Sequence, residues 1–192
     1  MGGAGISPPS YLSQSAGVVD LTGLGIYDLK IIAGGAAATC ADAPLAEGTY
    51  SLGLFLPIIL YQRQFGASPS FGLVLPALYP TVGSDLEAVP IHAADVGASV
   101  SIGATWTDGG AYVVSGLLPP GQTTTSLNIG AGELSFFVED DHGGRLYTGA
   151  TRVFDPGFGF AIYYPVSANG RGLVYCAEGP DGGARGGTCV AQ

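Results

Sequence analysis

The chain has 192 residues, of which 47% are hydrophobic and only 11% are charged, and its formal net charge is −9. This length suits one domain with a single sizeable core. The six basic residues form no stripe that would neutralise a row of phosphates, so the sequence predicts no direct contact with nucleic acid and none with an anionic membrane.

The charged residues are too few for an ordinary free surface. Six basic and fifteen acidic side chains must serve the whole exterior, whereas a well-behaved surface usually carries roughly 25–35% charged residues. The 33 glycines and 13 prolines lie mostly between apolar runs and indicate many turns. We therefore expect a surface built partly from small residues and partly covered by other subunits.

The chain divides into an arm and a domain. Residues 1–16 are small and polar and contain Pro8 and Pro9, which predicts an extended N-terminal arm that a neighbouring subunit holds in place. Residues 17–192 are predicted to form a single all-β domain. Within it, Val18–Ala33 suits one or two strands, and the Ala-rich segment Gly34–Glu47 contains the one short helical turn that we expect.

Dense apolar runs follow at Tyr50–Phe65 and Phe71–Tyr79, and they are typical of strands covered on both faces. The segment Ser84–Ala94 is more polar and is predicted to be a connection. The run Leu52–Tyr61 contains Pro57 and is too short to span a bilayer.

The segment Ala98–Thr107 alternates between apolar and small polar residues, as a strand with one buried face does. This alternation places Trp106 on the core side. Asp108, Gly109 and Gly110 then predict a tight turn into a second strand at Ala111–Leu118.

Two more hairpins follow. Gly132–Phe154 contains two β-prone runs around the turn Asp140-Asp141-His142-Gly143-Gly144, and Phe158–Val166 is joined to Gly172–Ala177 by Ala168-Asn169-Gly170. We count roughly ten strands, which predicts an antiparallel β-sandwich or jelly-roll-like domain. Besides Trp106, the aromatic residues expected in its core are Phe136 or Phe137, and Phe160.

The densest polar cluster is the turn at Glu139, Asp140, Asp141 and His142. Carboxylates and an imidazole on one turn can bind Ca²⁺ or a transition metal. The cluster lacks the alternating spacing of a calcium loop, so the sequence favours a solvated hairpin tip. No metal ligand and no cofactor is predicted.

A second candidate is His92, which Asp95 would orient as a general base. The segment Gly66–Ser70 only approximates a nucleophile elbow, so a histidine in a surface connection is favoured. The glycine-rich stretches Gly23–Asp28 and Gly182–Gly187 lack the residues of a nucleotide loop. We therefore predict no catalytic and no cofactor-binding residue, and expect the protein not to be an enzyme.

The three cysteines leave two interpretations open. Cys176 and Cys189 lie in the last two apolar runs and can form a disulfide across a terminal hairpin. The sequence favours two buried free thiols in a protein assembled in a reducing cytoplasm. A disulfide favours a secreted protein instead, and Cys40 has no evident partner.

These features together predict a non-enzymatic structural subunit of a larger assembly. In composition and architecture the chain resembles bacteriophage virion proteins, such as a capsid decoration or cement protein, a head-fibre protein or a tail accessory protein. Expected partners are copies of itself, as a trimer, and a capsid protein, with localisation in the virion after assembly in the host cytoplasm. One alternative is a secreted, extracellular carbohydrate-binding β-sandwich, for which Trp106 and the tyrosines would form a sugar platform. The other is a hydrolase with a dispersed catalytic site.

Overall fold

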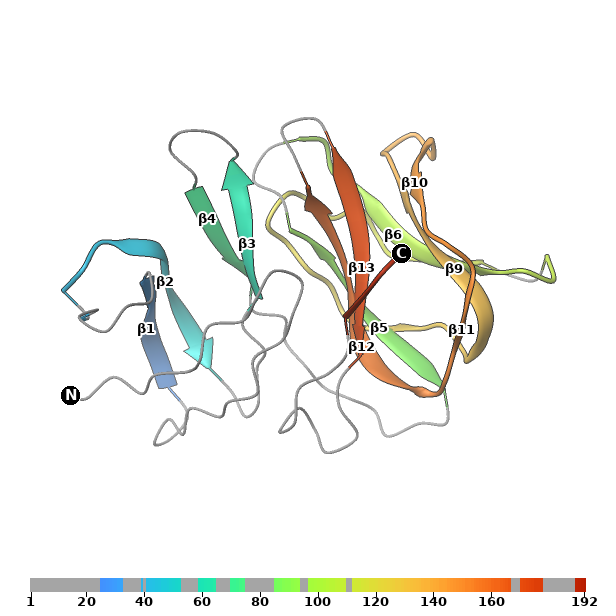
Figure 1. Cartoon of the computed structure of the whole chain (residues 1–192), viewed down its shortest axis with the longest axis horizontal. Helices are drawn as coiled ribbons and strands as arrows, with labels where there is room; N and C mark the ends of the chain where they lie inside the picture. Colours follow the sequence, from blue (N-terminus) through green and yellow to red (C-terminus); the bar gives the residue numbers. More distant parts are fainter. Residues whose placement is uncertain are drawn as a thin grey trace.

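The computed structural model describes residues 25–32, 39, 41–52, 59–64, 70–74, 85–93, 97–109, 112–166, 170–177 and 189–192. Every regular element in these ranges is a β-strand, so the predicted all-β class is confirmed (Figure 1). The predicted arm, residues 1–16, lies outside the described residues. In the described part of the chain, no helix has the length and apolar character needed to cross a membrane.

Five strands form the first sheet, in the order β10-β9-β6-β7, with β11 pairing with β9 as well. All of its pairs are antiparallel. Its strands are β6 (Ser101–Trp106), β7 (Tyr112–Val114), β9 (Gly132–Glu139), β10 (Arg145–Thr148) and β11 (Arg152–Phe154).

Five more strands form the second sheet, in the order β14-β13-β12-β5-β8. They are β5 (Leu86–His92), β8 (Leu127–Asn128), β12 (Gly157–Pro165), β13 (Arg171–Ala177) and β14 (Cys189–Ala191). The pair β5–β12 is parallel, which departs from the predicted antiparallel arrangement. The reason is topological: the chain visits the first sheet between these two strands, and such a long connection permits parallel pairing.

Both sheets contribute side chains to one inner core. Phe136 of β9 stacks on Tyr175 of β13, with ring centroids 5.2 Å apart, and both rings meet the edge of Phe154. The buried residues of this core are Leu86, Ala88, Val100, Ile102, Ala104, Leu118, Ile129, Leu134, Phe136, Val138, Phe154, Ala161, Tyr163, Leu173 and Tyr175. The predicted burial of Phe136 is therefore confirmed.

The second sheet is also apolar on its other face. An outer core gathers Val89 and Ile91 of β5, Phe160 of β12 and Val174 of β13, and Val74 of β4 (Ser70–Val74) packs onto them. Because cores lie on both faces, all seven residues of β5 are buried. The predicted burial of Phe160 is confirmed, although it belongs to this outer core.

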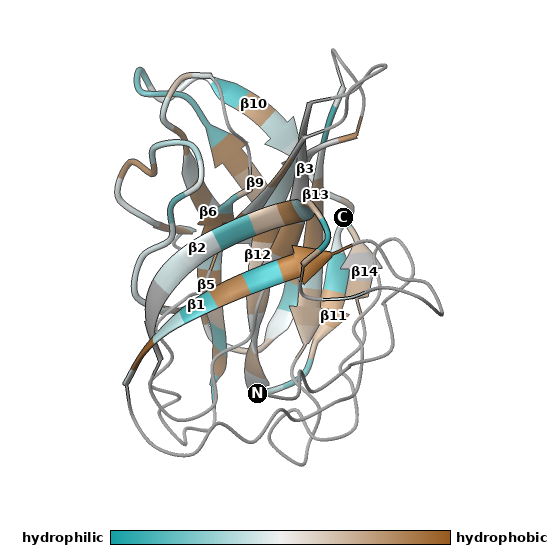
Figure 2. Cartoon of the chain, turned by 90° about the vertical axis from the view of Figure 1, so that its left-hand side faces the viewer, coloured by the Kyte–Doolittle hydropathy of each residue, from teal (hydrophilic) through white to brown (hydrophobic). Residues whose placement is uncertain are grey.

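The remaining strands form two hairpins beside the two sheets (Figure 1). One pairs β1 (Gly25–Ile32) with β2 (Pro44–Leu52), and the other pairs β3 (Ile59–Gln64) with β4. Along β1 the side chains from Gly25 to Lys30 alternate between half-buried and exposed. Figure 2 shows hydrophobic (brown) and hydrophilic (teal) residues following one another along this strand. Lys30 and Glu47 form a cross-strand ion pair at 3.7 Å.

The expectation of a helical turn within Gly34–Glu47 is wrong for the last four residues of that segment, because Pro44–Glu47 are the first residues of the strand β2. The part of that segment at 34–38 and 40 lies outside the described residues. Pairing with β1 determines the conformation here. The two facing strands form hydrogen bonds with backbone groups that would lack partners in a single helical turn.

The polar connection expected at Ser84–Ala94 is also wrong, because β5 is a buried strand in the interior of the second sheet. Pro90 is tolerated because β8 pairs only with Glu87 and Ala88. Beyond that point the backbone N–H of His92 bonds to the carbonyl of Gln122, and the Thr123 hydroxyl donates to the carbonyl of Pro90.

The three predicted hairpins are present as β6–β7, β9–β10 and β12–β13. Val100, Ile102 and Ala104 of the predicted core face are buried, but Ser101 and Gly103 of the other face are buried as well, so burial does not alternate here as expected. Ala98 is exposed and Trp106 is half-buried. The described residues form fourteen strands rather than about ten; one of the additional strands is β5, which lies where a connection was expected.

Candidate functional site

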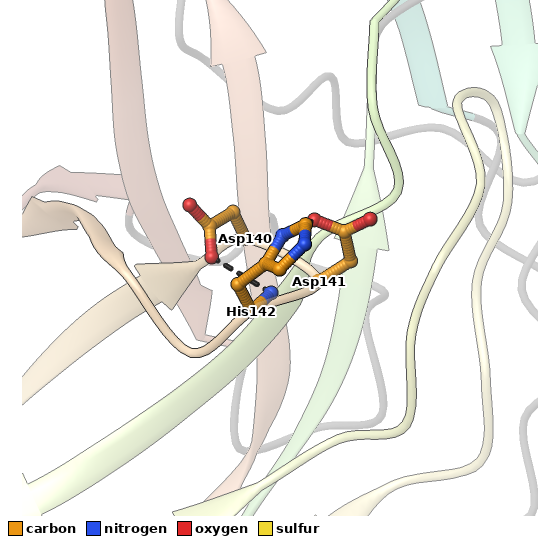
Figure 3. Close-up of side chains that lie close together, drawn as sticks. All are labelled: Asp140, Asp141 and His142. Atoms are coloured by element: carbon orange, nitrogen blue, oxygen red, sulfur yellow. Dashed lines mark hydrogen bonds and ion pairs between the residues drawn. The ribbon is translucent and has the colours of Figure 1, made fainter.

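The β9–β10 hairpin tip brings Asp140, Asp141 and His142 together (Figure 3). The backbone N–H groups of His142 and Gly144 donate to Oδ1 of Asp140 at 2.9 and 2.7 Å. Gly143 has a φ of 78°, which a residue with a side chain rarely adopts. The aspartate is therefore the internal cap of a tight turn, as the predicted solvated tip requires.

The electrostatics of the tip agree with this structural role. The backbone N–H groups of Gly144 and then of His142 hold the pKa of Asp140 below its usual value. His142 Nδ1 lies 2.6 Å from Oδ1 of Asp141, and both side chains are exposed. Ligand atoms of the three residues lie within 4.8 Å of one another, but one of the two Asp140 oxygens is already engaged by the backbone.

Glu139, the fourth residue of the predicted cluster, forms a different contact. Its Oε1 lies 3.0 Å from a guanidinium nitrogen of Arg145. The same guanidinium lies 3.6 Å from the centroid of the Phe137 ring. The structure thus separates Glu139 from the other three and uses it to position Arg145 over an aromatic ring.

His92 is buried, with 2% of its surface exposed, so the predicted position in a surface connection is wrong. Its Nδ1 lies 3.0 Å from the carbonyl oxygen of Leu118, and its ring lies 5.6 Å from that of Tyr163. Burial lowers the pKa of His92, and the nearby Arg171 acts in the same direction. The imidazole is therefore enclosed and neutral. It donates a structural hydrogen bond to the Leu118 carbonyl, and its burial keeps a substrate from reaching it.

The other predicted motifs are only partly described. Asp95, Gly66–Pro69 and Gly182–Gly187 lie outside the described residues. Gly25–Asp28, the described part of the first glycine-rich stretch, belongs to β1. This segment is therefore extended strand, whereas a nucleotide loop would lead into a helix.

The aromatic residues proposed for a sugar platform do not share one exposed surface. Tyr163 and Tyr175 are buried, while Trp106 is half-buried and packs against the inner core beside Gly130. Sequence reasoning missed Tyr112 of β7, which is 64% exposed and lies 6.3 Å from the Phe137 ring. No local sequence signal pointed to this contact, because it depends on the strand register that places Phe137 opposite Gly103, where the glycine leaves room for the ring.

One cavity of about 270 Å³ lies between β2 and β4 in the described structure, lined by residues of both strands. Its only charged lining residue is Glu47, which pairs with Lys30. The cavity therefore presents mainly strand residues and no cluster of reactive side chains.

The favoured interpretation of the cysteines is wrong, because Cys176 and Cys189 form a disulfide. They are directly opposite each other in the antiparallel pair β13–β14. Cross-strand pairing brought their side chains together, and sequence spacing alone left that register undetermined. Cys40 lies outside the described residues.

No protein-family model matches the chain, and neither the curated proteins nor the solved structures contain a significant match to it.

Proposed function

We propose that this chain is a non-enzymatic structural subunit of a bacteriophage virion, acting as a capsid decoration, head-fibre or tail accessory protein. The observation that carries the proposal is its exposed apolar surface. Ile26, Val153 and Tyr112 expose 76%, 75% and 64% of their surface, in a chain with 6 basic and 15 acidic residues among 192. Surfaces depleted of charge and enriched in aliphatic and aromatic side chains are typical of subunit interfaces.

The arrangement of the sheets supports this proposal. We infer that the two five-stranded sheets, which share one inner core, form a jelly-roll-like β-sandwich. Jelly rolls are used for both viral capsid and lectin domains. The parallel pair β5–β12 is a departure from the fully antiparallel form.

The proposed partners follow from the same features. Copies of the chain would associate as a trimer and dock on a capsid protein, and residues 1–16 would contact a neighbouring subunit. The scarcity of basic residues gives no reason to propose nucleic acid or membrane as a direct partner. No described group of side chains gives a reason to propose a cofactor or a catalytic site.

The test is to fractionate particles from the source on a density gradient and to detect this chain with a specific antibody. We expect the chain to migrate with intact particles, and the isolated protein to have the native mass of a trimer by light scattering. A protein found only in the soluble fractions, and monomeric when pure, would overturn the proposal.

A second candidate is a secreted carbohydrate-binding module, and the observation that favours it is the Cys176–Cys189 disulfide. Tyr112 would supply an exposed ring and Arg145 a hydrogen-bond donor on the outer face of the first sheet, and both contact the buried ring of Phe137. Saturable binding to a glycan array, lost in Tyr112→Ala, would favour this candidate. Its absence, together with migration on particles, would favour the structural subunit.

A further inference from the structure

The longest stretch of the sequence without a charged residue is residues 109–132, between Asp108 and Glu133. It contains β7, which is the last strand at one edge of the first sheet, and β8, which is the last strand at one edge of the second. These two strands contact each other. One side of the two-sheet body is therefore formed by a segment that is wholly uncharged.

This side, which we call the neutral edge, is exposed. Tyr112, Leu117 and Val114 expose 64%, 51% and 36% of their surface. The other exposed residues among those described in this segment are small, polar or proline: Gly109, Gly116, Pro119, Gln122, Thr125, Asn128 and Ala131. Ordinary loops at sheet edges usually carry charges, which keep open strands from pairing with other chains.

Among the residues that the structure describes, charged side chains lie at the border of the neutral edge. Asp85 accepts a hydrogen bond from the side-chain amide of Asn128, and Glu133 accepts one from the hydroxyl of Thr107. The opposite edge of the first sheet differs, because Arg145 lies on β10 and Arg152 on β11, and Glu139 of the adjoining β9 pairs with Arg145. An uncharged centre with a polar rim is the usual composition of a subunit interface.

We propose that the neutral edge is the surface through which copies of this chain associate, an inference that rests on the proposed function. The net charge of −9 makes two copies repel each other, and the repulsion is weakest where neither surface carries charge. A basic partner would instead be attracted to the acidic faces. In a trimer, the same side of each copy would face the three-fold axis.

The experiment compares two exposed leucines on opposite edges. Leu117→Glu places a charge on the neutral edge, and Leu146→Glu is the matched control on β10, where Leu146 exposes 49% of its surface. Thr125→Glu, at an exposed loop residue, adds the same charge to the neutral edge without removing an apolar group. Each protein is measured by sedimentation velocity over a concentration series, with circular dichroism to confirm folding.

We expect Leu117→Glu and Thr125→Glu to raise the dissociation constant at least about tenfold, and Leu146→Glu to leave it unchanged. If the natural protein associates and neither edge variant weakens it, the neutral edge is not the interface, whereas the proposed structural function survives. Equal dissociation in Leu146→Glu would also overturn the assignment. A natural protein that stays monomeric at every concentration overturns both proposals.

Discussion

Phe136 is the residue on which the inner core most depends. It is 1% exposed, stacks on Tyr175, and meets Phe154 edge-on at 5.3 Å. Phe136→Ala should lower the free energy of unfolding by about 3–5 kcal/mol, because the cavity would lie between two packed sheets. Urea denaturation measures this change. Val153→Ala, at a residue 75% exposed, is the control and should change stability by no more than about 0.5 kcal/mol.

His92 should make the fold sensitive to acid. Its pKa is below the ordinary 6.5, so the folded protein binds fewer protons than the unfolded chain. The stability is fully present above pH 6.5 and falls as the pH drops below it, by up to about 1.4 kcal/mol per pH unit. The Tyr163 ring lies beside His92, the backbone of Leu118 and Pro119 favours its protonated form, and the charge of Arg171 opposes it. Asp140 also loses stabilisation in acid, but only below its own ordinary value of 3.8.

Denaturant midpoints between pH 7.5 and 5 test this expectation. His92→Gln should flatten the dependence of stability on pH over this range. The side-chain amide of the glutamine does not titrate but can still donate a hydrogen bond to the Leu118 carbonyl. His142→Gln, at the exposed tip, is the control and should retain the loss of stability. A profile that stays steep in His92→Gln would contradict the assignment.

At the residue scale, the sequence predicted which aromatic residues are buried better than it predicted the polar ones. The expectation was that Phe136 or Phe137, and Phe160, would be buried, and the structure buries all three. Trp106 is only half-buried because β6 ends there, so Trp106→Ala should cost less than a fully buried aromatic. The position of His92 was predicted wrongly because the carbonyl of Leu118, to which its ring nitrogen hydrogen-bonds, lies far along the chain.

Gly103 is the residue that lets β6, β7 and β9 lie together. A Cβ there would lie against the carbonyl oxygen of Val113 and 2.6 Å from Cζ of Phe137. Gly103→Ala should therefore cost about 1–3 kcal/mol, because a backbone atom and a packed ring must move. Gly116→Ala is the control, since a Cβ there meets nothing within 4 Å. Equal thermal midpoints for the two variants would show that the β6–β7 pairing tolerates this crowding.

The strand β14 depends on its link to β13. Beyond the disulfide, the Gln192 carbonyl accepts from the Tyr147 hydroxyl at 2.6 Å and the backbone N–H of Gln192 donates to Leu173. Cys176→Ser/Cys189→Ser should lower the free energy of unfolding by about 3 kcal/mol, given the sequence separation of 13 residues. A reductant should destabilise the natural protein by a similar amount and leave the double variant unaffected.

Counting thiols tests the pairing itself. The natural protein, unfolded without a reductant, should react with an alkylating reagent at one cysteine, and after reduction at three. Three reactive thiols before reduction would restore the free-thiol interpretation and remove the main support for a secreted module.

At the element scale, the hairpins could be predicted because each is closed by a tight turn. The residues that specify such a turn, for example Asp-Gly or Gly-Gly, are adjacent in the sequence. β5 was not predictable in the same way. Glu87, Pro90 and His92 give it a polar appearance, yet it is covered by two cores. Its neighbour β12 lies far along the chain, so neither its burial nor its parallel pairing is encoded locally.

At the scale of the whole molecule, the composition shows that charged residues are scarce, but it does not show where on the surface they lie. The neutral edge became visible only when the fold placed β7 and β8 side by side at the edges of their sheets. The residues Asp140–His142 are the opposite case, because there the sequence pattern was visible locally. The structure explains its first aspartate by the hydrogen bonds that hold the turn rather than by a metal.

The salt dependence of self-association follows from this charge distribution. Copies that meet through the neutral edge share no ion pairs, while their net charges of −9 and the bordering Asp85, Asp108 and Glu133 repel. The Debye length falls from about 30 Å at 0.01 M salt to about 8 Å at 0.15 M, so added salt should screen this repulsion. Light scattering should then show the dissociation constant falling as sodium chloride is raised over this range. Leu117→Glu, which adds one more negative charge per copy at the contact, should respond more steeply. Association that is strongest at the lowest salt would indicate an interface held by ion pairs, and such an interface would have to lie on the charged edge formed by β10 and β11.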